Sequence, residues 1–121
     1  MCSDEAVARY RLRVPFHLFD MIVSIAPITS EELEAGPGEA SEPIRRRIEA
    51  AKRSLSKDRP APSAEAAESD VRRVLAGLTS NSAARLLRVA QTIARLEGSD
   101  RPSVAHVREA VSLRIGPGAR E

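Results

Sequence analysis

Arginine carries nearly all the positive charge in this chain, because every one of the 19 basic residues other than Lys52 and Lys57 is an arginine. Three of these, Arg85, Arg88 and Arg95, recur on one side of a predicted helix. A row of guanidinium groups is a candidate site for phosphate, either of a nucleotide or of nucleic acid. The other interpretation is that the row is only the solvated back of an amphipathic helix.

Two further arginine groups are weaker candidates. Arg45, Arg46 and Arg47 are consecutive, and on a helix they spread over about 200 degrees, so we expect ordinary solvation and not a binding face. Arginines also stand at residues 9, 11 and 13, ahead of an apolar run. We interpret them as part of an arm or of an incomplete element, with a nucleic-acid contact as the alternative.

Nucleophiles and metal ligands are sparse. His17 and His106 lack the paired spacing of metal ligands, and Cys2 has no accompanying histidine motif. Ser80 and Ser103 each open an apolar-periodic segment, as helix caps do. The residues therefore predict no independent active site, no metal and no cofactor.

The composition bounds the fold class and the compartment. Of 121 residues, 42% are apolar but only 2% are aromatic, which favours a mainly α domain with a core of small aliphatic side chains. A single cysteine and no long apolar run predict a cytoplasmic protein without membrane contact. The net charge of +2, with mixed signs, makes nucleic acid a weak partner.

The first 40 residues are predicted to hold an arm and a short buried strand at about 16–25, which ends before Pro27. Residues 31–38 are acidic and then rich in glycine and proline. From residue 41 the pattern turns helical. We expect a first helix at about 42–57, with an apolar face of Ile44, Ile48, Ala51 and Leu55.

Three more helices are expected to complete a packing unit of about 75 residues. After a loop at 58–62, Ser63 caps a helix that ends near Gly77 and faces inward with Ala67, Val71, Val74 and Leu75. The next begins at Thr79 or Ser80, is apolar at residues 83, 86, 87, 90, 93 and 94, and ends at Gly98. The last opens at Ser103, ends at Gly116 and buries Val104, Val107, Ala110 and Val111.

Three stretches resemble the C-terminal region of the magnesium-chelatase and competence-type AAA+ family. Residues 38–53 are similar to the helix that leads into the lid, and residues 104–114 to the last helix. Residues 78–100 resemble the sensor-2 helix, with Arg-Leu-Leu-Arg-Val-Ala at 85–90, Thr-Ile-Ala at 92–94 and Gly-Ser at 98–99. Residues 2–3, 9–10 and 19–25 are weakly similar to the end of the ATPase core.

The resemblance implies a four-helix AAA+ lid-type bundle, preceded by a short strand-like segment and an N-terminal arm. Its domain organisation would be residues 1–40 as the arm and a remnant of the core, residues 41–115 as the helical lid, and residues 116–121 as a tail. The family's lid arginine would fall at Asn81, and its arginine finger at Leu18 or Met21. Neither alignment supplies an arginine, and such a finger contributes roughly three to five orders of magnitude in rate.

ATP-binding motifs are also absent from the sequence. No glycine-rich phosphate loop precedes Lys52 or Lys57, and no acid follows the apolar run at 21–25. We therefore expect a free-standing, non-catalytic lid domain that associates with an AAA+ ATPase or with its own copies, a homodimer being one form. The alternatives are a DNA-binding accessory domain that uses Arg85, Arg88 and Arg95, and a truncated, decayed relative of a DNA-acting ATPase. An enzyme is the last alternative.

Overall fold

The computed structural model describes residues 3–55 and 67–115. Its longest helix is α5 (Ser80–Leu96). Its start is set by Thr79, whose hydroxyl accepts a hydrogen bond from the Ser82 amide at 3.3 Å. Its end is set by Gly98, whose φ of +80° places it in the left-handed region that favours glycine. The helix and both caps confirm the prediction.

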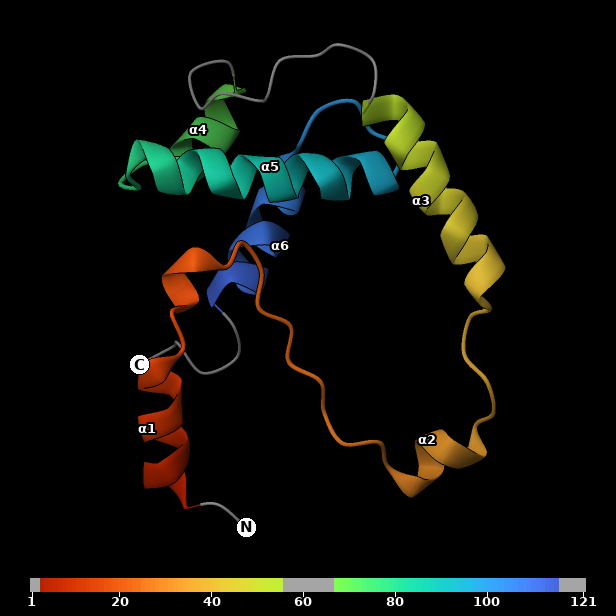
Figure 1. The fold of residues 1–121 in the computed structure, drawn as a ribbon. Coiled ribbons are helices and arrows are strands. Elements are labelled where there is room, and N and C mark those ends of the chain that lie inside the picture. Colours follow the sequence, from red (N-terminus) through yellow and green to blue (C-terminus); the bar gives the residue numbers. More distant parts are fainter. Residues whose placement is uncertain (1–2, 56–66, 116–121) are drawn as a thin grey trace.

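The core forms where α5 packs against α6 (Val104–Ile115) and where α4 (Ser69–Leu75) packs against α6 (Figure 1). Helices α5 and α6 present the apolar faces that were predicted for them. Helix α4 buries Val71 and Leu75 of its predicted face, but Ala67 lies before its first residue. Leu87 of α5, Val71 of α4 and Val107 of α6 are the largest fully buried side chains among the described residues. Aliphatic side chains of this size suit close helix packing, and the fold is mainly α as expected.

Helix α3 (Ser41–Leu55) joins this core only through its C-terminal part (Figure 1). Ala51 is buried, but Ile44 and Ile48, which share its helix face, are exposed. The prediction of the helix is confirmed, and its apolar face is covered only in part. Helix α5 ends at Leu96 and therefore covers only one end of α3.

The region before α3 consists of α1 (Asp4–Arg13), one turn of 3-10 helix, η1 (Phe16–Leu18), and α2 (Ser30–Glu34). In Figure 1 residues 21–40 leave the packed helices, pass through α2 and return at α3. The strand expected at 16–25 is not formed, because the part of the chain that the structure describes contains no strand with which it could pair.

The N-terminal segment, which the sequence predicted to be an arm or an incomplete element, forms a helix. Ser3 accepts a hydrogen bond from the Ala6 amide, acids occupy the first turn of α1, and Arg11 and Arg13 occupy its last turn. Acids at the N-terminus and arginines at the C-terminus of a helix interact favourably with its dipole. No residue of α1 is buried.

Some expectations fall outside the described residues, namely the loop at 58–62, the Ser63 cap and the tail at 116–121. In the described residues α4 begins only at Ser69, later than a helix capped by Ser63 would begin. Glu68 takes its N-cap position and makes no side-chain capping bond. Among the helices of the described ranges, none has the length and apolar character needed to cross a membrane.

Candidate functional site

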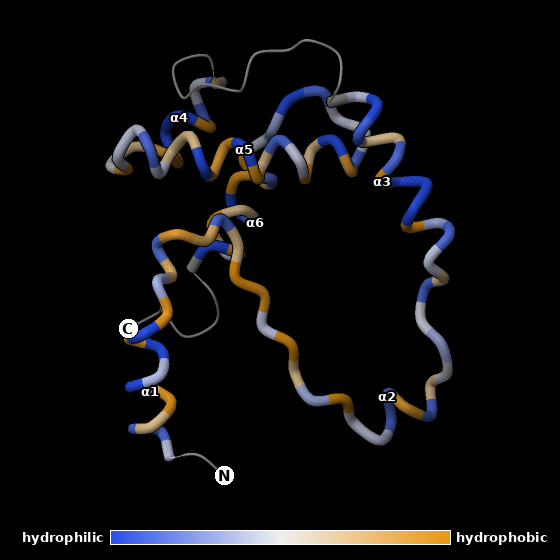
Figure 2. Tube along the Cα trace, in the orientation of Figure 1, coloured by the Kyte–Doolittle hydropathy of each residue, from blue (hydrophilic) through white to orange (hydrophobic). Residues whose placement is uncertain are grey.

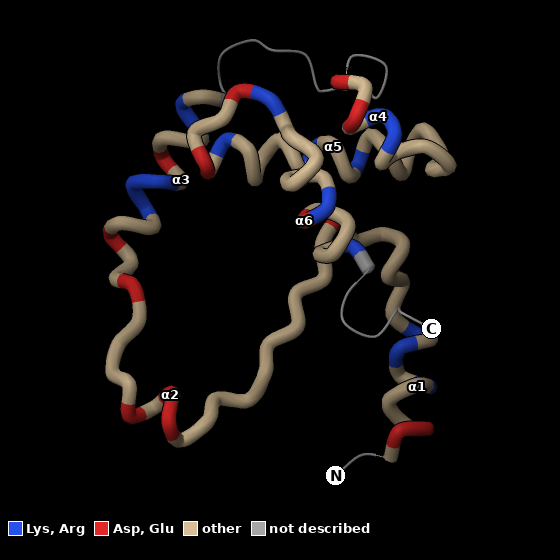
Figure 3. The backbone as a smooth tube through the Cα atoms, turned by 180° about the vertical axis from the view of Figure 1, so that it is seen from behind, with Lys and Arg blue, Asp and Glu red and all other residues tan. Residues whose placement is uncertain are grey.

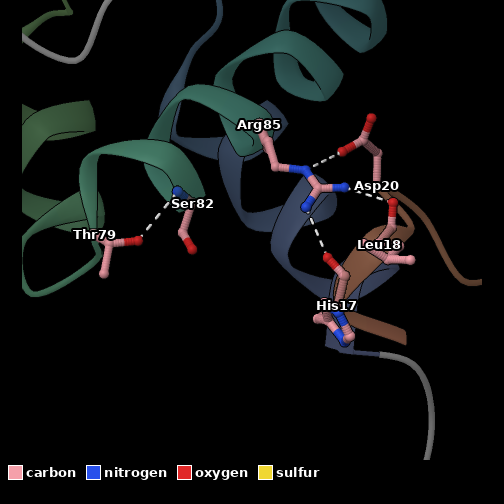
Figure 4. Close-up of polar contacts among 6 residues, drawn as sticks. All are labelled: His17, Leu18, Asp20, Thr79, Ser82 and Arg85. Atoms are coloured by element: carbon pink, nitrogen blue, oxygen red, sulfur yellow. Dashed lines mark hydrogen bonds and ion pairs between the residues drawn. The ribbon is translucent and has the colours of Figure 1, made fainter. Parts of the chain in front are cut away.

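The predicted site residues all come from α5, whose N-terminus holds Asn81. This residue, the position of the family's lid arginine, is exposed and uncharged in the first turn of the helix. The turn is capped by Thr79 and not by Asn81 (Figure 4). A helix start of this kind offers backbone amides but no guanidinium group to a ligand.

Arg85, one turn further along α5, is fully engaged by the N-terminal region. Its Nε donates to Asp20 Oδ1 at 2.6 Å, and its two terminal nitrogens donate to the backbone oxygens of His17 and Leu18, each at 2.7 Å (Figure 4). Three nitrogens of one planar group thus bind two residues of the turn η1 and Asp20, which follows it. Arg85 therefore fastens this segment to α5.

The Asp20 carboxylate is the anionic half of this arrangement. Its hydrogen bond from Arg85 holds the pKa of Asp20 below its usual value, with further lowering by the charges of Arg85, Arg88 and Arg114, against an opposing effect of burial. Beside it, the Ile22 amide donates to the Leu113 oxygen of α6 at 2.6 Å. Residues 17–22 are consequently tied to both long helices of the core.

The two alternative positions of the arginine finger lie in or next to this segment. Leu18 ends η1 and Met21 follows Asp20, and both side chains are exposed. The backbone oxygen of Leu18 already accepts from Arg85. Neither position brings a cation to the start of α5.

Arg95, near the end of α5, is buried, with a relative exposure of 8%. One terminal nitrogen donates to the Ser54 hydroxyl of α3 and to Asp100 Oδ1, the latter at 2.7 Å. Gln91 adds a bond to the backbone oxygen of Asp100 at 3.1 Å. Arg95 therefore joins α3, α5 and the loop after α5, and its expected place in an exposed row is wrong.

Only Arg88 of the three arginines remains open to solvent, and it forms no ion pair within the described part of the chain. The row expected from the helical spacing is thus divided into two internal clamps and one exposed side chain. Spacing alone placed these residues on one side of α5. It could not reveal that Asp20, Ser54 and Asp100 would cover two of them.

The predictions for the remaining polar residues agree with a structural role. The Ser103 amide donates to His106 Nδ1 at 3.0 Å, and His106 Nε2 lies 2.7 Å from Glu97 Oε2. The Ser103 hydroxyl also lies 3.2 Å from Nδ1 and accepts from the His106 amide at 3.5 Å, so the two residues cap the start of α6 reciprocally. In residues 3–55 and 67–115, no three His, Cys, Asp or Glu side chains gather as a possible metal site.

The three consecutive arginines of α3 are solvated, as expected. Arg45 and Arg46 pair with Glu42 at 3.8 and 3.0 Å, and all three side chains are exposed. Arg47 forms a two-pronged pair with Glu39, with both distances 2.8 Å. Neighbouring acids neutralise this run, so it offers no concentrated positive field.

Comparison with known proteins gives one finding. The family model described as "Magnesium chelatase, subunit ChlI C-terminal" matches residues 58–114, a range that includes α4 and α5 and all but the last residue of α6. The search of curated proteins and the search of solved structures each gave no match.

Proposed function

Because residues 58–114 of the chain belong to the magnesium-chelatase C-terminal family, an AAA+ lid domain, we propose that the protein is a non-catalytic interaction module. Its partners would be an AAA+ ATPase or further copies of itself. The contribution of the chain would be a helical surface for binding, with no chemistry of its own.

The observation that carries this proposal is the unburied first part of the chain. No residue between positions 3 and 50 is buried. Large apolar residues are nevertheless exposed there, and Figure 2 shows hydrophobic positions recurring along the segment between η1 and α2. Apolar surface on this scale marks an interaction site, because leaving it in water costs free energy.

A non-catalytic role is supported by the residues at the start of α5. Asn81 has no charge to place on a phosphate. Arg85 already gives three hydrogen bonds to residues 17–20, which would have to break before it could bind a nucleotide. With no phosphate-binding loop in the sequence, we expect no ATP turnover.

The DNA-binding alternative has less support. It relied on a line of phosphate contacts by Arg85, Arg88 and Arg95, of which only Arg88 is exposed. The basic side chains at 45–47 are paired with Glu39 and Glu42. A weak, strongly salt-dependent affinity for DNA is the most that this distribution predicts.

The test is the mass of the purified full chain in solution, measured by light scattering at low and high salt, with and without Mg-ATP. A species larger than 13.1 kDa that resists salt and ignores ATP would support an apolar interaction module. Phosphate release is measured on the same samples. Turnover above that of a matched buffer control would contradict the non-catalytic role, and a chain that is always monomeric would exclude self-association and leave an ATPase partner.

A further inference from the structure

The apolar face of α3 continues beyond the part that α5 covers. Ala51 is buried against the core, whereas Ile48 and Ile44, one and two turns earlier on the same face, are 41% and 37% exposed. They line an open pocket whose other walls are Ser41, Arg45, Glu49 and Lys52. All six of these residues belong to α3, so no other element of residues 3–55 and 67–115 lines this pocket.

A second unpartnered apolar strip follows the clamp made by Arg85. Met21, Val23 and Ile25 alternate along the coil between η1 and α2, and in an extended chain alternate residues face the same side. Val23 is 69% and Ile25 90% exposed. From Val23 to Ile28, no backbone amide donates to another backbone group in the described residues.

Within one chain the two strips are held apart. The strip of residues 21–25 starts at the Arg85 clamp and at the bond from Ile22 to Leu113, while α3 is held to α5 through Ser54 and Arg95. Figures 1 and 3 both show the chain leaving the packed helices after η1, turning at α2 and returning to α3. Each apolar strip is therefore exposed to solvent, although each could bury the apolar side chains of the other.

The charges beside the two apolar strips are complementary as well. Helix α2 directly follows the apolar coil and carries acids at residues 31, 32 and 34, without a basic residue (Figure 3). The α3 pocket is lined by Arg45, Lys52 and Glu49, and Arg45 also pairs with Glu42 at 3.8 Å. Over its whole length α3 carries five basic residues and two acids, so its surface is net basic. When the coil of one molecule lies on the α3 face of another, its acidic helix is brought to a basic edge, which favours this pairing.

We infer that the partner is a second copy of this chain, in a two-fold dimer where the coil at 21–28 of each molecule covers Ile44 and Ile48 of the other. This inference rests on the proposed function and names its partner and contacts. A two-fold axis makes the contact twice, because each copy supplies one coil and one helix face. Burying two such sets of aliphatic side chains provides the driving force.

The experiment uses two single variants of the full chain, Ile25→Glu and Ile48→Glu, in light scattering over a range of concentrations. The wild type should show twice its 13.1 kDa, and each variant should show the monomer mass. Leu12→Glu, at a position on α1 that is 86% exposed, is the control and should remain dimeric. Circular dichroism checks that all three variants keep the wild-type helicity.

Mixing the two variants tests the reciprocal arrangement. Ile25→Glu retains an intact α3 face and Ile48→Glu retains an intact coil, so the mixture regains one of the two contacts. We expect a heterodimer in the mixture that neither variant forms alone, with weaker affinity than the wild type.

Other outcomes overturn the inference in distinguishable ways. A dimer lost with Ile25→Glu but kept with Ile48→Glu would mean that the coils pair with each other. A dimer that survives both would place the interface elsewhere and leave the proposed function intact. A wild-type chain that is monomeric at every concentration would remove this inference together with self-association, leaving a different protein as the partner.

Discussion

At the scale of single residues, the arginines of α5 show how one residue type takes different roles on one helix. Arg85 and Arg95 turn toward neighbouring segments and Arg88 toward solvent, although the helical spacing groups all three. The difference lies in the acids that reach each position. Asp20 and Asp100 accept charge-assisted hydrogen bonds from the first two, and such bonds are stronger than neutral ones.

Replacing Arg85 by lysine should release residues 17–22 from the core. Lysine keeps the charge but cannot donate in three directions from a planar group. We expect the Ile22 amide to exchange its hydrogen about tenfold faster, equivalent to about 1.4 kcal/mol of lost docking free energy. Hydrogen exchange followed by NMR measures this. Arg88→Lys is the control, and equal effects of the two substitutions would contradict a specific clamp.

Docking of this segment should also depend on pH through Asp20. The pKa of Asp20 is lowered in the folded chain, chiefly by the Arg85 hydrogen bond. Its contribution is therefore present above the ordinary aspartate value of about 4 and is lost as the pH falls through the lowered pKa. NMR shifts of the Ile22 amide should change in this acidic window, and Asp20→Asn should abolish the change. A transition that persists in Asp20→Asn would assign it to another group.

At the scale of elements, the attachment of α3 is the point where the tertiary structure departs most from the helical pattern. The helical spacing of its apolar residues predicted an apolar face on α3. In the structure the helix is held at its C-terminal part, by Ala51 and by the bond from Arg95 to Ser54. A helix face determined by local sequence still requires a neighbour of sufficient length to cover it.

Removing the acid that serves Arg95 should weaken this attachment. In Asp100→Ala the buried guanidinium keeps only Ser54 as a partner, which we expect to lower the unfolding free energy by about 1–2 kcal/mol in urea. Arg95→Met with Asp100→Ala should cost less than Asp100→Ala alone, because no buried charge remains. Asp70→Ala, which removes an exposed pair with Arg73, should change stability by less than about 0.5 kcal/mol.

An Asp100→Ala chain as stable as the wild type would show that solvent already satisfies Arg95. Faster exchange confined to the amides of α3 and the end of α5 would support the clamp. Faster exchange spread evenly over all helices would instead indicate a general loss of stability.

At the scale of the whole molecule, the chain divides into a packed part and an unburied part. The described core residues come from α3, α4, α5 and α6, with Ala51 as the first buried residue. The region before it contributes the Arg85 clamp and a large apolar surface. Stability and association are therefore expected to depend on different segments.

Deleting residues 1–37 tests this division. The remaining chain should keep cooperative unfolding, with a loss of no more than about 1–2 kcal/mol from the missing Arg85 contacts. It should also lose self-association, because the coil at 21–28 is gone. Urea unfolding and light scattering measure the two effects. An unfolded product would show that the first residues belong to the cooperative core, against this prediction.

Local signals were enough to predict the helices of the packed part. Thr79 and Gly98 delimit α5, and the apolar spacing of α5 and α6 identifies the residues that are buried. The prediction of a strand at 16–25 was wrong because a strand does not depend on local signals alone. A strand is defined by partners elsewhere in the chain, and an apolar run alone does not supply them.

The sequence by itself therefore determined the mainly α class, the caps and core faces of α5 and α6, the lid resemblance and the missing charge at Asn81. Only the tertiary structure decided that Arg85 and Arg95 are internal clamps and that Ile44 and Ile48 stay uncovered. The physical reason is distance along the chain. Caps and helical periodicity act within a few residues, whereas Asp20 lies 65 residues from Arg85 and Ser54 lies 41 from Arg95, so folding alone brings them together.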